Sequence, residues 1–231
     1  MALSDEIKEE QKKVKDMPLS GKIKYVLDYY KIHILVGLLV VIFGVVFVRD
    51  WINNSKPTYL DAVVLNTILD YNEDSDMAAD LAKYANVDLE EYKITIDTTL
   101  QIDLESNTQM GMASEQKLLA LFAAKEIDVF MAPEEVADFY AKEDAFSDIR
   151  SLLTEDEIKA FTDAGYPLYY ATCEGVTFPA GFYLNASDYL KRISEHGTFI
   201  PEDNAIFATT TCDQHPEAAV QFLRMITEVP N

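Results

Sequence analysis

The 231-residue chain has room for one ordinary domain with appendages, and its apolar fraction of 49% is that of a protein with a packed core. The formal net charge is −21, and residues 51–231 hold eleven Lys or Arg against thirty-three acids. Such a surface repels nucleic acid and anionic lipid, so its expected partners are cations, basic proteins or polar neutral solutes. A simpler interpretation is that the charge keeps an exposed domain soluble.

The most apolar part of the chain is a run of fifteen residues without a polar side chain, residues 34–48. At roughly −0.3 to −0.6 kcal/mol each on an insertion scale, its Ile, Leu, Val and Phe residues contribute about −4 to −8 kcal/mol. Tyr29, Tyr30 and Trp51 flank the run where interfacial aromatic residues belong. We therefore predict a transmembrane helix over residues 29–52.

The orientation of this span follows from the basic residues around it. Six lysines lie within about 20 residues before the run, whereas only Arg49 and Lys56 lie close behind it. The positive-inside rule places residues 1–28 in the cytoplasm and the C-terminal part outside the cell membrane. A cleaved signal peptide is disfavoured, because its charged region would be some thirty residues long and no A-x-A site follows. We expect a retained signal anchor.

Residues 53–57 form a polar stalk, and residues 58–231 alternate between strand-like and helix-like segments. The predicted strands are 59–65, 92–98, 127–131, 168–172, 176–184 and 205–211. The predicted helices are 74–84, 114–125, 133–141, 155–164, 187–196 and 217–227, and Thr154 is suited to cap the fourth of them. Alternation of this kind indicates an α/β fold with one largely parallel sheet and helices on both faces.

The two cysteines, Cys173 and Cys212, both lie in the acidic part of the chain. An extracellular compartment permits a disulfide between them, which would close a loop of about 40 residues and stabilise the fold by roughly 3–4 kcal/mol. The alternative is two buried free thiols.

No pattern in the sequence indicates catalysis, a cofactor or a metal. Residues 70–76 place oxygens at alternate positions as a calcium loop does, but Ser75 and Leu81 stand where that loop needs Gly and Glu. The three histidines are scattered, and neither a nucleophile motif nor a glycine-rich phosphate loop is present. We predict that the chain is not an enzyme.

Three stretches resemble the extracellular solute-binding proteins of bacterial ABC importers. They are Lys125-Glu126-Ile127-Asp128-Val129, Ala145-Phe146-Ser147-Asp148-Ile149, and the closing PEAAVQFL of residues 216–223. The resemblance covers residues 58–231 and implies a type II periplasmic-binding-protein-like fold. The chain departs from that family in one respect: return strands follow Leu153 within about 15 residues, so the family's second lobe is missing or vestigial and we expect one lobe. The YYKIH entry into the span resembles uncharacterised single-pass proteins of Gram-positive, Firmicutes-type bacteria.

The resemblance implies a membrane-tethered, non-catalytic domain that binds a polar small molecule or presents it to a partner. In open α/β sheets, ligands lie beyond the carboxyl ends of the strands. The predicted strands place five hydrogen-bonding residues there: Asn66, Thr67, Thr98, Thr99 and Glu134. Ordinary loop capping is the simpler role for them. The alternative function, favoured by the acidic surface and the missing lobe, is a structural protein that docks on another envelope protein without a small-molecule ligand.

Overall fold

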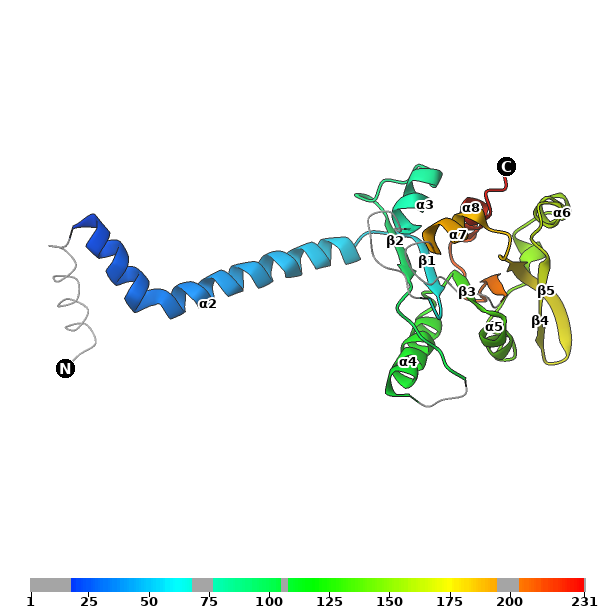
Figure 1. The fold of residues 1–231 in the computed structure, drawn as a ribbon, viewed down its shortest axis with the longest axis horizontal. Coiled ribbons are helices and arrows are strands. Elements are labelled where there is room, and N and C mark those ends of the chain that lie inside the picture. The colour runs from blue at the N-terminus through cyan, green and yellow to red at the C-terminus, as the bar shows by residue number, and fades with distance from the viewer. Residues whose placement is uncertain (1–17, 68–76, 105–107, 195–203, 231) are drawn as a thin grey trace. The chain divides into compact units, whose positions relative to one another are not determined.

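The computed structural model describes residues 18–67, 77–104, 108–194 and 204–230. The chain divides into two compact units, residues 1–55 and residues 56–231. The first unit is dominated by one helix, α2 (Leu19–Asn54), whose 36 residues span about 54 Å (Figure 1). Within it, Lys31–Arg49 has a mean hydropathy of 2.7 and no buried residue, so the helix is long and apolar enough to cross a membrane. A signal sequence has the same properties.

The predicted span of residues 29–52 lies wholly within α2, but the stalk is shorter than expected. The helix continues through Asn54, and Ser55 ends it by donating from its hydroxyl to the carbonyl of Trp51 at 2.7 Å. Residues 55–57 alone therefore link α2 to the first strand.

The second unit is built on one six-stranded sheet. Its strands are β1 (Thr58–Val64), β2 (Lys93–Asp97), β3 (Val129–Pro133), β4 (Leu168–Cys173), β5 (Val176–Tyr183) and β6 (Ala205–Thr209). Their order across the sheet is β2-β1-β3-β6-β5-β4 (Figure 1). β1 runs parallel to both β2 and β3, whereas β3, β6, β5 and β4 pair antiparallel in succession.

The sheet is therefore mixed, and the prediction of a largely parallel sheet is wrong. β4 and β5 are joined by the tight turn Glu174-Gly175, whose φ angles of 48° and 81° are those of a primed hairpin turn. A two-residue connection joins antiparallel strands only, because parallel strands need a long crossover. Parallel pairing is confined to β1, β2 and β3, although helices also lie between β3 and β4 and between β5 and β6.

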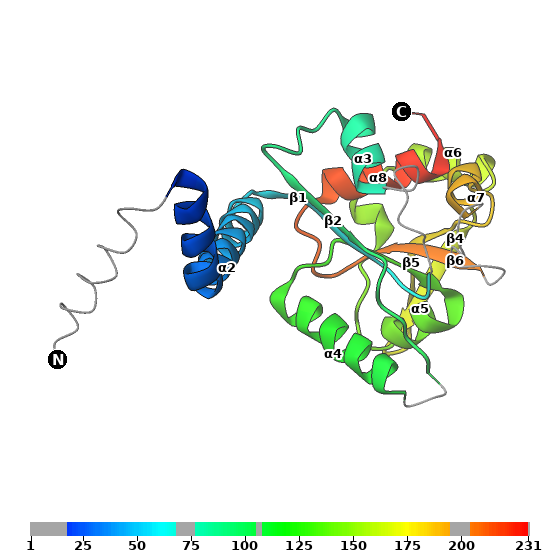
Figure 2. The same ribbon diagram turned by 60° about the vertical axis from the view of Figure 1, so that its left-hand side comes forward.

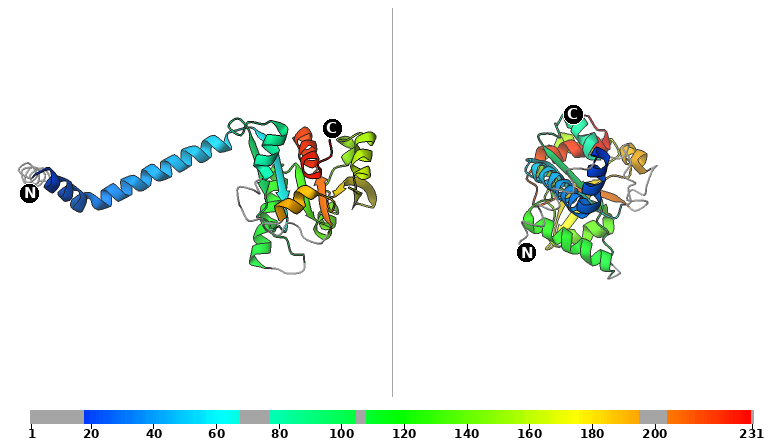
Figure 3. Two further views of the ribbon diagram at one scale, coloured as in Figure 1. Left: turned by 45° about the horizontal axis from the view of Figure 1, so that its top comes forward. Right: turned by 90° about the vertical axis from the view of Figure 1, so that its left-hand side faces the viewer.

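Helices cover both faces of the sheet, as predicted (Figure 2 and Figure 3). One face carries α3 (Met77–Ala85), α6 (Glu155–Asp163), α7 (Asp188–Ser194), α8 (Pro216–Thr227) and the 3₁₀ turn η2 (Ile149–Ser151); the other carries α4 (Gln109–Ala124) and α5 (Glu134–Ala141). Neighbouring strand residues point to opposite sides, so Val64 packs in the first hydrophobic cluster and Val63 in the second. The sheet is therefore buried from both sides.

Helix capping explains where two of these helices begin. At α6, Thr154 caps the helix as predicted, and it forms a reciprocal capping box with Glu157: the Thr154 amide donates to the Glu157 carboxylate at 2.8 Å. α4 begins five residues before the predicted Ser114, because the Thr108 hydroxyl accepts from the Gly111 amide at 3.0 Å. The glycine and the irregular apolar spacing of its first turn conceal that start in the sequence.

Gly181 marks the closest approach of β5 to β6. A Cβ at this position would overlap the carbonyl oxygen of Phe207 and lie 2.7 Å from its carbonyl carbon. Only glycine therefore allows the two strands to pair in this register.

We expect Gly181→Ala to lower the free energy of unfolding by about 3 kcal/mol or more, because the new methyl group meets backbone that has no room to yield. Urea unfolding of the full chain in detergent, followed by near-UV circular dichroism, measures the loss. Gly175→Asn is the matched control: its φ of 81° suits Asn and its Cβ meets open space, so the expected loss is under about 1 kcal/mol. Equal stability of the two variants would contradict the β5–β6 register.

Candidate functional site

A groove of about 840 Å³ lies at the carboxyl ends of the three parallel strands. We call it the switch-point groove, because β2 and β3 lie on opposite sides of β1 and the chain leaves β1 and β3 in opposite directions. Its described lining comes from the segments after β1, β2 and β3 and from the start of α4: Asn66, Gln101, Ile102, Asp103, Leu104, Thr108, Met110, Gly111, Pro133, Glu135 and Val136.

Asn66 holds the floor of this groove together. Its side-chain amide donates to the Ile102 carbonyl at 2.8 Å, and its carbonyl oxygen accepts from the Ile102 amide at 2.7 Å. The Asn66 backbone amide also donates to the Leu100 carbonyl at 3.1 Å. Asn66 has a φ of 57°, a left-handed conformation that asparagine tolerates better than most residues. The residue thus joins the end of β1 to the segment that follows β2.

Gln101 extends the same network toward α4. Its side chain donates to the Thr67 carbonyl at 2.8 Å, and its backbone amide donates to the Ser114 hydroxyl at 3.1 Å. Ser114 lies on the buried side of α4, so the helix is anchored to the groove floor through a satisfied polar contact. Internal hydrogen bonds therefore organise the floor, together with the burial of Leu100 and Ile102 in the second hydrophobic cluster.

The electrostatics of the groove are those of an acidic site. Asp103 and Glu135 supply the formal charges of its described lining, which contains no Lys or Arg. α4 and α5 both direct their N-termini toward it, and Glu134 and Glu135 occupy the first turn of α5. The carboxylates therefore lie beside the positive ends of two helix dipoles, which favour negative charge at this position.

The five residues predicted from the strand ends have different fates. Asn66 lines the groove. The Thr67 and Thr98 side chains are buried, and the Thr99 hydroxyl caps its own turn by donating to Asp97 at 2.6 Å. Glu134 begins α5. These last four residues support neighbouring segments and are absent from the lining.

Glu134 links the start of α5 to the antiparallel half of the sheet. Its carboxylate accepts from the Tyr183 hydroxyl at 2.5 Å and from the Asn204 side-chain amide at 2.7 Å. Burial, followed by the hydrogen bond to Glu134, raises the pKa of Tyr183 to about 12. Tyr183 is therefore a donor that holds α5 in place at any ordinary pH.

Sequence reasoning missed most of the polar lining of the groove. Thr108 was detectable as an N-cap, and Glu135 adjoins the predicted Glu134 in the same helical turn. Gln101 and Asp103 carried no signal, because they lie in an irregular segment whose position depends on the Asn66 contact.

The predicted disulfide is not formed: Cys173 and Cys212 are both free thiols. Cys173 ends β4, whereas Cys212 follows β6, and β5 lies between these strands. Two strand spacings amount to about 10 Å, beyond the Cα separation that a disulfide spans. The Cys173 thiol lies 3.8 Å from the Lys142 carbonyl, and the Cys212 thiol lies 3.5 Å from the Phe122 carbonyl.

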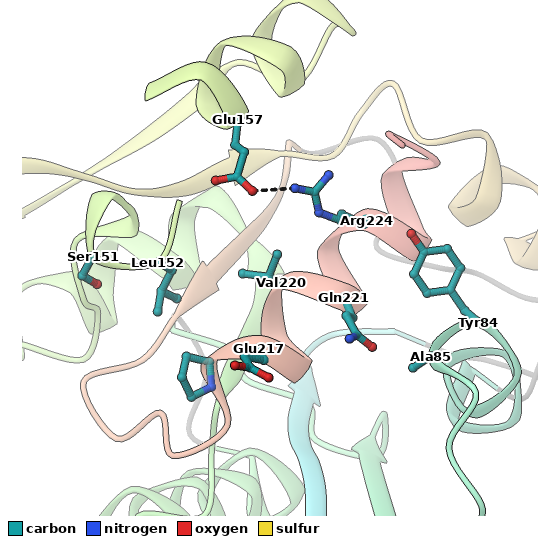
Figure 4. A pocket seen from close by; sticks show the side chains of 10 residues that line it. Tyr84, Ala85, Ser151, Leu152, Glu157, Glu217, Val220, Gln221 and Arg224 are labelled. Carbon is teal, nitrogen blue, oxygen red and sulfur yellow. Dashed lines mark hydrogen bonds and ion pairs between the residues drawn. The ribbon is translucent and has the colours of Figure 1, made fainter. Parts of the chain in front are cut away.

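A second groove, of about 610 Å³, lies on the opposite face of the sheet over α8 (Figure 4). Arg224 is the cation in its described lining, with a side chain only 8% exposed. The guanidinium is already committed: it donates to Glu157 at 2.7 Å and to the Pro230 carbonyl at 2.8 Å, and it stacks over Phe161. This groove therefore presents a structural ion pair that ties α6 to α8.

A cluster of acids surrounds His215 at the amino ends of the parallel strands, which is the end of the sheet opposite the switch-point groove. Asp128, which immediately precedes β3, is 2% exposed and accepts from the backbone amides of Asp61 and Gln214, each at 2.8 Å. The His215 ring nitrogen Nδ1 lies 2.9 Å from the same carboxylate. Asp213 accepts from the His215 amide at 2.8 Å. The cluster fixes the loop that leads into α8.

Among the described residues no group of His, Cys, Asp and Glu has the arrangement of a metal site. Residues 70–76, whose oxygen spacing was compared with a calcium loop, lie outside the described residues, as does His196.

No family model, curated protein or solved structure matches the chain. The likeness to solute-binding proteins therefore stays a prediction.

We expect Asn66→Ala to lower the free energy of unfolding by roughly 2–4 kcal/mol, because it leaves two buried backbone groups unpaired and places a Cβ without polar partners at positive φ. Asn66→Gly loses the same hydrogen bonds but accepts the backbone angle, so it should be about 1 kcal/mol more stable than the alanine variant. Urea unfolding of the full chain measures both. Wild-type stability in the alanine variant would show that the floor is not held by this residue.

Burial, together with repulsion from Asp128, raises the pKa of Asp213 to about 6. The folded chain thus holds this proton more tightly than the unfolded chain, so the free energy of unfolding should fall as pH rises from about 4 to about 6. Asp213→Asn should remove roughly 1–3 kcal/mol of that fall. Unfolding curves of both chains across this range measure it, and parallel pH profiles would contradict the assignment.

Proposed function

We propose that this chain is a single-pass membrane protein whose outer domain, residues 58–231, binds a polar small molecule in the switch-point groove without catalysing a reaction. α2 serves as a retained anchor, with residues 1–28 in the cytoplasm and the domain outside the cell. The domain is a one-lobed relative, in fold, of the type II periplasmic binding proteins.

The anchor is supported by α2 itself. None of the residues of its apolar stretch is buried, so among the described residues no packing partner compensates the cost of placing it in water. Lipid is the solvent that such a surface fits. The excess of lysine before the stretch supports the proposed orientation.

One observation supports the binding function: a groove of ligand size lies beyond the carboxyl ends of β1, β2 and β3, at the point where the strand order reverses. Open α/β sheets bind their ligands in this position, because the diverging loops leave a crevice there. A volume of about 840 Å³ suits a small molecule. The floor is held by the Asn66 and Gln101 contacts, so little ordering is needed when a ligand enters.

The chemistry of the lining favours a ligand with a positive charge or with several hydrogen-bond donors. Asp103 and Glu135 are acceptors only, and the backbone around them belongs to a strongly acidic domain. The net negative potential concentrates cations near the surface, whereas it repels anionic solutes. Ile102, Leu104 and Val136 provide apolar wall for the carbon skeleton of such a ligand.

The test is ligand-dependent thermal unfolding of the full chain in detergent, with spermidine, choline and L-lysine amide as cationic probes. Glutamine and maltose serve as neutral probes, and glutamate and inorganic phosphate as anionic ones. We expect at least one cationic probe to raise the melting temperature, since a probe at 100 times its Kd stabilises the folded state by about 2.7 kcal/mol.

Glu135→Gln should weaken the binding of that probe about ten-fold or more, because it removes a charge from the lining. Glu143→Gln is the matched control: this exposed glutamate follows the other end of α5, outside the lining, and its loss should leave the affinity unchanged. Flat melting temperatures for all probes would contradict small-molecule binding and favour the alternative, a domain that docks on another envelope protein.

A further inference from the structure

The outer face of α4 is unlike the rest of the domain surface. Ten of its sixteen residues are exposed, none of the ten is acidic, and seven are apolar. Leu119 is 60% exposed and Met112 is 45% exposed, and four alanines surround them: Ala113, Ala120, Ala123 and Ala124. An isolated surface helix normally turns charged residues outward. α4, which lies outermost on its face of the sheet in Figure 2, turns an apolar strip outward instead.

The spacing of this strip suits contact with another helix. Ala113 and Ala120 are seven residues apart, as are Met112 and Leu119, so each pair lies on one side of α4. Small residues between larger ones allow two helices to approach closely while Met and Leu fill the flanks. The helix therefore presents a ready surface for a helix of similar character.

Charge decides where two copies of this chain can meet. Residues 51–231 carry thirty-three acids against eleven basic residues, so most approaches of one domain to another are repulsive. The exposed residues of α4 are an exception because they include no acid; the half-buried Glu115 borders the strip, and its one exposed lysine, Lys117, is paired with Asp97 at 2.6 Å. A basic partner would be drawn to the acidic surfaces rather than to this neutral strip.

We propose that the outer face of α4 is a self-association surface, on which a second copy of this chain packs its own α4. The contact pairs one apolar strip with its own copy, as a two-fold dimer does. In this contact the two domains meet through the surfaces between which electrostatic repulsion is weakest.

The size of the strip sets the strength of this contact. α4 is about 24 Å long, so the interface buries on the order of 400 Å² per copy, below what a stable dimer in dilute solution needs. Anchoring in a membrane, which is part of the proposed function, raises the local concentration of copies to roughly the millimolar range. The dimer is therefore weak in solution and populated in the membrane.

The anchor offers a matching surface. Gly37 and Gly44 lie seven residues apart on one side of α2, and a Cβ at either would meet nothing within 4 Å. Small residues on one side of a transmembrane helix let a second helix approach closely. Lipid is the weaker candidate for the α4 strip itself, because membrane-surface helices carry Trp or Phe with a basic rim, and this strip has alanines instead.

Cysteine crosslinking of the full chain in lipid vesicles tests the contact. In a Cys173→Ser, Cys212→Ser background, Gln116→Cys places a thiol at the middle of the strip, near the two-fold axis for either direction of the partner helix. Thr162→Cys, exposed on α6 over the opposite face of the sheet, is the control. We expect the Gln116 variant to form crosslinked dimer at least ten-fold faster. Adding Ala120→Glu, an exposed change that introduces a charge, should abolish the difference.

The same crosslinking, repeated in detergent at hundred-fold higher protein concentration, tests the α4 contact independently of the proposed membrane anchor. Should the chain prove extractable from membranes by alkaline carbonate, the anchor fails, yet the excess at Gln116 persists in concentrated solution. Equal rates at Gln116 and Thr162 in both media would overturn the α4 contact whatever the fate of the anchor. An excess at Gln116 that survives Ala120→Glu would overturn it too.

Discussion

The structure depends on burying one sheet from both sides. β3 and β6 at its centre are apolar on both faces, with every described residue buried except Pro133. Helices must therefore lie on both sides, and the chain supplies them by crossing from one face to the other between β1, β2 and β3. Those crossovers make the first three strands parallel, so the carboxyl ends of all three lie at the same end of the sheet. The groove is a geometric consequence of that burial.

The parallel and antiparallel halves of the sheet have different structural roles. The parallel half ends at the groove, whose floor is joined by Asn66 and Gln101. The antiparallel half supports it, because Tyr183 on β5 holds Glu134 at the start of α5. At the opposite edge, the buried Asp128 fixes the loop into α8. At both ends of the strands, buried backbone groups lack strand partners. Polar side chains supply the hydrogen bonds that these groups need.

The sequence predicted the α/β class, both helix layers and the long apolar helix that covers residues 29–52, because apolar patterning is a local property. The capping box of Thr154 and Glu157 was predictable for the same reason. The antiparallel half was not, since strand direction depends on which strands meet in space; only the turn at Gly175 offered a local signal. Of the site, Asn66 was found from its place after β1, whereas Gln101 and Asp103 depend on a long-range contact that no local pattern records.

We propose that anchor and groove together make a tethered acidic domain that binds cationic or donor-rich solutes at the carboxyl ends of its parallel strands. Hydrogen–deuterium exchange of the full chain in lipid nanodiscs tests this proposal most directly, measured with and without a saturating concentration of whichever cationic probe raises the melting temperature. The account predicts that exchange slows in residues 66–67, 101–104, 108–111 and 133–136, which line or adjoin the groove. Slowing confined to the α8 groove, or no slowing in any segment of the chain, would contradict it.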